Sequence, residues 1–436
     1  MNRIYKIVWS KAKNAYVVTS ELAKNHTKSA SGKAVKAALA AAVGMGLLMG
    51  GYTASAADNT PGAGSGVAIG TGSNAPKEEN VAVGKGAIIK YSNGASAATG
   101  DVAVGSDAVI DNYASQGGSI AIGKNAKIEN MTGKQESLFA LGQTTYHSGN
   151  FWGTLQIPDN PENVAGSIAI GDNTYARTGS IMIGSHNYRG DIGDQSVDTS
   201  KTKDYGVNIN ATTLGTNSFN QGAFSTVSGA YSIISGKYDG SGFSSHVGQN
   251  FGATITGSLN SIESATASSR YSGIANSIVG TANRTFNSNG SLIFGAGNEI
   301  TNSITSITAP SDGGSSAKEL SDKLRTAVKN SNSGGATLAI GGGNTADWTQ
   351  LSQIIGVNNT LKGESGAISK FNMIDGYKNT VTKVEHVSVI GSENTVENSK
   401  SQTVIGDSNK ITDRNAGTVS GKQEERTKNV SDLVIG

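Results

Sequence analysis

The chain has 436 residues, of which 59 are glycine, 5 are proline and none is cysteine. Charged residues make up 16% and aromatic residues 6%, which disfavours a thick globular core and suits repetitive β structure with recurring glycine turns. The lack of cysteine excludes disulfides, thiol catalysis and thiolate metal sites. Residues 1–36 hold eight basic residues and one acidic residue, so the remainder is mildly acidic and no nucleic-acid partner is expected.

The N-terminal segment has the organisation of an export signal. An apolar run at 37–52 follows the basic residues and is too short and too rich in glycine for a transmembrane helix. Ala54 and Ala56 follow in the A-x-A pattern of a signal-peptidase site. We predict that residues 1–56 are removed by cleavage before Ala57; the alternative is an uncleaved anchor.

The basic segment is longer than an ordinary signal requires. It contains the opening Met1-Asn2-Arg3-Ile4-Tyr5, the pair Val8-Trp9 and the run Ser20-Glu21-Leu22-Ala23-Lys24. This sequence resembles the extended signal peptide region of type V secretion passengers. The resemblance implies a large outer-membrane autotransporter or a two-partner relative, exported through the periplasm to the cell surface.

A short phrase recurs after this segment, as in GVAIG, NVAVG, DVAVG and SIAIG. If its glycine is position 0, branched aliphatic residues such as Val81 and Val83 occupy −3 and −1, and alanine occupies −2. This alternation predicts a strand with −3 and −1 on one face and −2 on the other. A second strand is expected after the turn, with apolar residues at +3 and +5, as at Ala87 and Ile89. The turn glycines with a predicted structural role include Gly70, Gly84, Gly105, Gly123, Gly171, Gly391 and Gly406.

One copy of the phrase is too small to fold by itself. A buried aliphatic side chain contributes roughly 1.5–3 kcal/mol, whereas ordering the backbone costs about 1–2 kcal/mol per residue. Stacking of copies closes that gap. The glycines are often 14 or 15 residues apart, as from Gly70 to Gly84 and from Gly391 to Gly406.

Later copies carry asparagine at +3. Asparagine tolerates unusual turn geometry, and stacked copies predict an amide ladder along the turns. The alternative is a glycan or ligand contact. The clearest ladder candidates are Asn359, Asn379, Asn394 and Asn409. Position −2 changes from alanine to residues such as Ile278 and Val389, which we interpret as a change in what the outer strand face packs against.

Three longer insertions interrupt the repeat, at 143–166, 190–210 and 301–335. In the last one, Ser316 and Glu319 form a capping box ahead of a helical apolar stripe, which predicts a short amphipathic helix near 315–330.

The first insertion is the best candidate for ligand contact, because loops vary without disturbing a scaffold and exposed aromatic residues serve as anchors. The alternative is that its aromatic residues pack against a neighbouring chain. The candidates are Tyr146, His147, Asn150, Phe151 and Trp152.

The repeat resembles the YadA-like head of trimeric autotransporter adhesins. The resemblance implies an all-β, left-handed parallel β-roll of about 14–15 residues per coil, three of which pack side by side as a homotrimer. It places this head at 57–189, a loop insertion at 190–210 and a variant roll at 211–436. The alanine at −2 is similar to the family's small residue that faces the sister chains. The chain stops in the middle of a repeat, so a neck, stalk and outer-membrane anchor are expected in a C-terminal region outside it.

The expected function is non-enzymatic attachment to host matrix, host cells or other bacteria. No cofactor or metal is implied, because the five histidines show no HxxxH or HExxH spacing and no nucleophile or phosphate motif is present. One alternative is a left-handed β-helix acyltransferase, although its six-residue period does not continue here. Another is a structural surface spacer, which would share every feature of the repeat but lack a specific binding surface.

Overall fold

The protein is described by a computed structural model that covers residues 5–10, 15–20, 60–91, 99–112, 117–130, 150–151, 155–156, 166–177, 179–187, 210–220, 222–235, 249–264, 272–307, 317–331, 337–414 and 432–436. The chain divides into two compact units, Met1–Ala57 and Asp58–Gly436. In the first unit, β1 (Tyr5–Ser10) and β2 (Ala15–Ser20) form an antiparallel pair.

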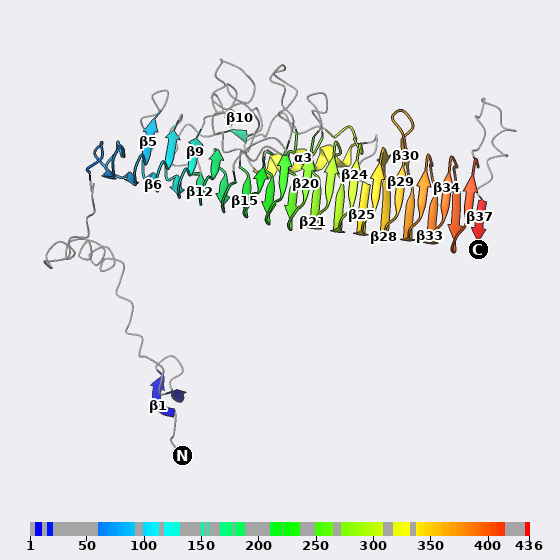
Figure 1. Ribbon diagram of the computed structural model, residues 1–436, viewed down its shortest axis with the longest axis horizontal. Coiled ribbons are helices and arrows are strands. Elements are labelled where there is room, and N and C mark those ends of the chain that lie inside the picture. The colour runs from blue at the N-terminus through cyan, green and yellow to red at the C-terminus, as the bar shows by residue number, and fades with distance from the viewer. Residues whose placement is uncertain are drawn as a thin grey trace. The chain divides into compact units, whose positions relative to one another are not determined.

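The second unit is a stack of rungs, and the repeated phrase supplies one strand of each rung (Figure 1). These strands form a continuous parallel sheet, called here the long sheet. Its strands, in order, are β3 (Val67–Ile69), β4 (Val81–Val83), β6 (Val102–Val104), β8 (Ile120–Ile122), β12 (Ile168–Ile170), β14 (Ile181–Ile183), β15 (Thr212–Leu214), β17 (Thr226–Ser228), β19 (Thr254–Thr256), β21 (Ser277–Thr281), β23 (Leu292–Ala296), β25 (Thr337–Gly342), β28 (Ser352–Val357), β31 (Met373–Tyr377), β33 (Ser388–Ser392), β35 (Gln402–Ile405) and β37 (Asp432–Ile435).

The segment after each turn builds the opposite wall, called here the second wall. This wall consists of a 4-stranded parallel sheet followed by a 10-stranded one. The first sheet contains β5 (Ile88–Tyr91), β7 (Val109–Asn112), β9 (Lys127–Asn130) and β13 (Tyr175–Arg177). The second contains β16 (Phe219–Asn220), β18 (Ile233–Ser235), β20 (Ser261–Glu263), β22 (Arg284–Phe286), β24 (Glu299–Thr301), β26 (Thr345–Asp347), β29 (Thr360–Lys362), β32 (Thr380–Thr382), β34 (Thr395–Glu397) and β36 (Lys410–Thr412).

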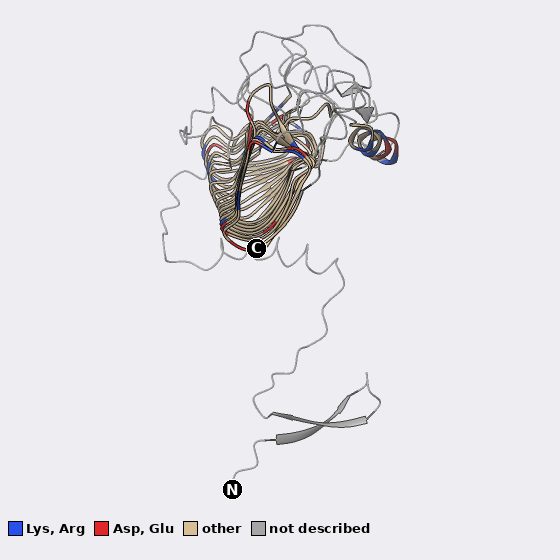
Figure 2. Ribbon diagram, turned by 90° about the vertical axis from the view of Figure 1, so that its right-hand side faces the viewer, with Lys and Arg blue, Asp and Glu red and all other residues tan. Residues whose placement is uncertain are grey.

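The strands pair in the register of the phrase, so each residue lies beside its counterpart in the next copy. Ala82 pairs with Ala103, and Gly376 pairs with Gly391. Figure 2 shows the superposed rungs in a view along this unit, with few charged positions on them. The all-β class and the parallel sheets predicted from the repeat are confirmed, as is the short helix predicted from the insertion at 301–335.

The later rungs also have a short third side. There β27 (Thr349–Gln350) pairs in parallel with β30 (Ser369–Lys370), and single bridges continue the line through Glu385 to Lys400. The repeat predicts two strands per rung and gives no sign of this third side. It is only two residues long where it is paired, so these rungs do not have the three full strands of the acyltransferase alternative.

The core lies between the long sheet and the second wall, and the residue at −2 points into it. Ala82, Ala103, Ile278 and Val389 are all fully buried within one chain. The expectation that the alanine at −2 faces sister chains is therefore wrong. The small side chain fits beside larger ones from the second wall, such as Ile110.

The helix α3 (Ala317–Lys329) lies within the predicted range of 315–330. Its Leu320 is buried, and Leu324 lies close to Gly252 of the roll. The opposite face is charged and carries ion pairs such as Lys318–Asp322 at 2.7 Å. The helix therefore packs its apolar stripe against the roll; Ser316 of the predicted capping box is outside the described residues.

Candidate functional site

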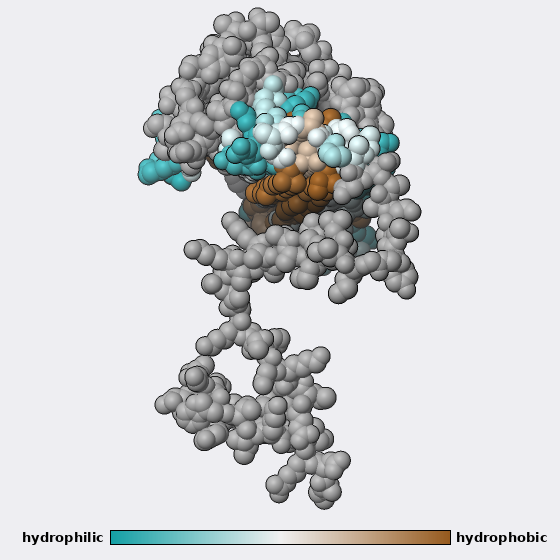
Figure 3. Space-filling model, turned by 90° about the vertical axis from the view of Figure 1, so that its left-hand side faces the viewer, coloured by the Kyte–Doolittle hydropathy of each residue, from teal (hydrophilic) through white to brown (hydrophobic). Residues whose placement is uncertain are grey.

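The outward side of the long sheet, called here the outward face, is lined by the residues at −3 and −1. Exposed apolar side chains lie on it in the early and in the later rungs, each between 37% and 49% exposed: Val67, Ile69, Ile122, Ile183, Leu214, Phe294, Ile340, Ile390 and Ile405. Between these two groups, β17 and β19 carry only threonine and serine at −3 and −1. Figure 3, which looks at the unit from the end of its first rungs, shows hydrophobic residues gathered on one side of the stack. At about 4.8 Å per strand, the outward face extends roughly 70 Å from β3 to β35.

One charged residue interrupts the −3 and −1 columns in the described strands. Asp375 occupies −1 on β31, where its neighbours in register are Ile355 of β28 and Ile390 of β33. Its side chain is exposed. Elsewhere these columns carry aliphatic, aromatic, hydroxyl or amide side chains, so the outward face is nearly free of charge.

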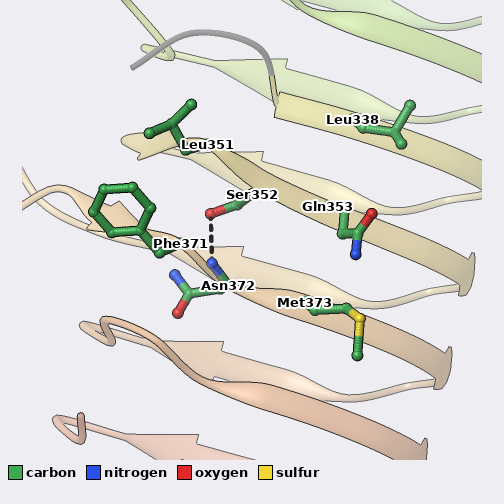
Figure 4. Close-up of a pocket in the computed structure, with 7 residues that line it drawn as sticks. All are labelled: Leu338, Leu351, Ser352, Gln353, Phe371, Asn372 and Met373. Atoms are coloured by element: carbon green, nitrogen blue, oxygen red, sulfur yellow. Dashed lines mark hydrogen bonds between the residues drawn. The ribbon is translucent and has the colours of Figure 1, made fainter. Parts of the chain in front are cut away.

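A shallow groove of about 420 Å³ lies along one edge of the outward face, on three successive rungs (Figure 4). Leu351 and Phe371 form its outer margin and are each 43% exposed. The backbone N–H of Asn372 donates to the hydroxyl of Ser352 at 3.2 Å and ties two rungs together at its floor. The remaining lining side chains are Leu338, Gln353 and Met373, all at −3.

The groove margin continues as a corner column of stacked side chains. The rings of Phe371 and His386 stack with centroids 4.6 Å apart. Beside them, Glu385 pairs with Lys400 at 2.9 Å and with Lys370 at 3.7 Å. The hydrogen bond from Lys400 lowers the pKa of Glu385 below its usual value. This column combines aromatic and charged side chains, whereas the groove beside it is largely apolar.

The predicted turn glycines all have a positive φ, from +116° at Gly70 to +137° at Gly391. They also stack closely. A Cβ at Gly84 would lie 2.5 Å from the carbonyl oxygen of Gly105, and a Cβ at Gly391 would lie 1.9 Å from that of Gly406. The turn therefore requires glycine for its backbone conformation and for space.

The asparagines at +3 form a buried chain of hydrogen bonds. The Oδ1 atom of Asn379 accepts from the backbone N–H of Asn394 at 3.0 Å and from its Nδ2 at 2.9 Å. The Nδ2 atom of Asn379 donates to the carbonyl of Gly391 at 2.7 Å. The same pattern links Asn359 to Asn379 and Asn394 to Asn409.

A second polar column, at −4, escaped the sequence analysis. Asp101 is buried there and accepts from the backbone N–H of Ser119 at 2.9 Å and from Nδ2 of Asn112 at 2.7 Å. Burial raises the pKa of Asp101 to about 6, although both hydrogen bonds act in the opposite direction. Small polar residues recur at −4 in later copies, and this recurrence was the available signal.

The predicted ligand-contact residues are only partly covered. Asn150 and Phe151 form β10 (Asn150–Phe151), which pairs antiparallel with β11 (Leu155–Gln156). Tyr146, His147 and Trp152 lie outside the described residues, as do the predicted cleavage residues Ala54, Ala56 and Ala57.

Among the described residues, no three side chains of the usual metal-binding types lie close enough together to hold an ion. In the same part of the chain, no helix is both long and apolar enough to cross a membrane.

The N-terminal residues match known proteins. A family model described as "Extended Signal Peptide of Type V secretion system" matches residues 1–50. A curated relative, the autotransporter adhesin NhhA of Neisseria meningitidis serogroup B, is 58% identical over 40 residues. That match covers 9% of this chain and 7% of the relative, so the chain spans only a small part of the relative's length.

Proposed function

We propose that this chain, which carries the extended signal peptide of the type V secretion system and is exported to the cell surface, forms the head of a trimeric adhesin. The observation that carries the proposal is the outward face. Left-handed winding of the roll and anchoring in the outer membrane through a further C-terminal region belong to the same proposal.

The outward face favours packing between copies. Soluble monomers rarely expose contiguous apolar patches larger than a few hundred Å². Here exposed apolar residues recur over many rungs on both sides of the hydroxyl-bearing strands β17 and β19, on a face roughly 70 Å long. Ile122, Ile340 and Ile390 supply branched aliphatic surface with almost no charge among them. Because every rung presents the same positions, identical copies aligned side by side match rung for rung.

Attachment would then be multivalent. Three copies present three sets of the same loops, and linked weak contacts raise apparent affinity by about 10²–10⁴. The insertion at 143–166 is the proposed contact region, with β10 and β11 as its described part. The proposed ligand is a component of a surface: host matrix, a host-cell glycan or protein, or another bacterium.

The test couples binding to assembly. The full chain is applied to immobilised matrix proteins, glycans and whole cells, beside an Ile122→Asp variant and a control, Thr380→Asp, on the exposed side of the second wall. We expect saturable binding that Ile122→Asp weakens by about 10²-fold or more while the control leaves it unchanged.

A third variant, lacking residues 143–166, is expected to keep its assembly state and lose binding. Assembly without binding to any of these surfaces would contradict the adhesin proposal and favour the structural spacer.

A further inference from the structure

Both edges of the outward face carry exposed apolar side chains in the same two rungs. At the −5 edge, these are Leu351 and Phe371 of the groove, and at the +1 edge they are Val357 and Tyr377. The latter two are 45% and 42% exposed. In the next rung the corresponding edges are polar, with His386 at −5 and Ser392 at +1.

Rotational symmetry would bring the −5 edge of one copy against the +1 edge of the next copy. In a closed ring of three identical copies, each copy uses one edge against the opposite edge of its neighbour. Identical rungs lie at the same height along the axis. The −5 edge of the rung at 371–377 therefore meets the +1 edge of the same rung in the next copy.

We propose that the groove at Phe371 in one copy receives Tyr377 of the next copy, with Val357 packing beside Leu351. This inference rests on the proposed trimer and deepens it by assigning the contact that fixes the alignment of the three copies. The groove lining is largely aliphatic and aromatic, and the amide of Gln353 lies on it for the tyrosine hydroxyl. A large amphipathic ring in an apolar pocket is the usual anchor of a protein interface.

The surroundings of both groups support this assignment. Phe371 is fixed by its stacking on His386, so the groove is formed before association. The ammonium group of Lys378 lies 5.0 Å from the centroid of the Tyr377 ring, a cation–π contact between two exposed side chains. Contacts that both side chains already make in the single chain reduce the side-chain entropy that association would cost.

The absence of cysteine makes cross-linking a clean test. In the full chain, Phe371→Cys and Tyr377→Cys are combined, and a short bifunctional thiol reagent is added before denaturing electrophoresis. We expect covalent dimers and trimers from the double variant and none from either single variant. The matched control combines Phe371→Cys with Thr380→Cys on the second wall and should stay uncross-linked.

Two outcomes would overturn the inference while leaving the proposed function standing: a trimer by sedimentation that the double variant does not cross-link, or dimers formed by Tyr377→Cys alone. Absence of a trimer would overturn both. A second measurement applies if the cysteine substitutions themselves prevent assembly. In that measurement, Tyr377→Ala should weaken association of the chains at least about tenfold. Tyr231→Ala, at a similarly exposed tyrosine, should leave it unchanged. Equal effects of the two alanine variants would also contradict the inference.

Discussion

Glycine at position 0 is required for two independent physical reasons. Its φ lies in the left-handed range, which residues with a Cβ rarely adopt. It also packs directly on the carbonyl of the glycine in the next rung, as Gly376 does on Gly391. The turn in the sequence predicts the unusual φ, but the steric requirement depends on close stacking of rungs, which a single copy of the repeat does not reveal.

Gly391→Ala is therefore expected to lower the free energy of unfolding by at least about 2 kcal/mol, because backbone strain and a steric clash act together. The matched control is Gly342→Ala, where φ is ordinary and the added Cβ would meet its nearest atom at 3.6 Å. Thermal and denaturant midpoints of the two variants check this. Similar losses for both would contradict the stacking account.

The asparagine ladder makes a comparable prediction for a buried amide. Asn379→Ala removes the Nδ2 group that donates to Asn359 and Gly391 and the Oδ1 atom that accepts from Asn394. The free energy of unfolding should fall by about 2–4 kcal/mol. Asn379→Ser should cost less, because Ser232 already stands at +3 in this chain and donates to the carbonyl of Gly257 at 2.8 Å. Chemical denaturation of both variants gives the comparison, and a serine variant as unstable as the alanine variant would count against a ladder role.

The buried Asp101 predicts a pH dependence of stability. The pKa of Asp101 in the folded chain is about 6, above its usual value of 3.8. The stabilisation that Asp101 contributes to the folded state is therefore complete below pH 3.8 and is lost as the pH rises through 6. Compared with an Asp101→Asn variant, the unfolding free energy of the unmodified chain should fall by on the order of 2–3 kcal/mol between pH 4 and pH 7. Denaturation of both chains across this range measures the difference, and parallel pH profiles would exclude this role for Asp101.

At the scale of the strand and helix, period-two alternation predicts the strands but not which face is inside. Branched residues at −3 and −1 suggest a core, yet they lie outside, and alanine at −2 fills the narrow space between the walls. Which face is buried depends on the second wall, where side chains such as Ile89 fill most of the core volume beside the alanines. The groove could not be predicted, because Leu351 and Phe371 lie before the phrase, at a corner that only the fold places beside −3.

The helix α3 is predicted correctly, because its apolar stripe and charged residues are contained in one local segment. Leu320→Ala should destabilise the docked helix by about 2–3 kcal/mol, since the side chain of Leu320 is buried. Val328→Ala is the control, because Val328 is 39% exposed. Hydrogen exchange across 317–329 should accelerate only in the first variant, and equal exchange in both would contradict the docking of this face.

At the scale of the whole roll, stability is the sum of contacts between neighbouring rungs. The interior closes within one chain, as the buried residues at −2 show, but the outward face does not. Repetition therefore gives the protein a regular scaffold together with a long surface that is nearly free of charge and presents the same positions on every rung. The loops can vary on this scaffold without disturbing either property.

The central claim is that the outward face joins three copies, and the mass of the full chain in sedimentation equilibrium tests it most directly. At micromolar concentration the account predicts three times the 44.4 kDa of one chain. An Ile390→Asp variant, which places a second charged column residue beside Asp375, should sediment as a monomer with unchanged β-sheet content. A monomeric unmodified chain, or a variant that assembles as well as the unmodified chain, would contradict the account.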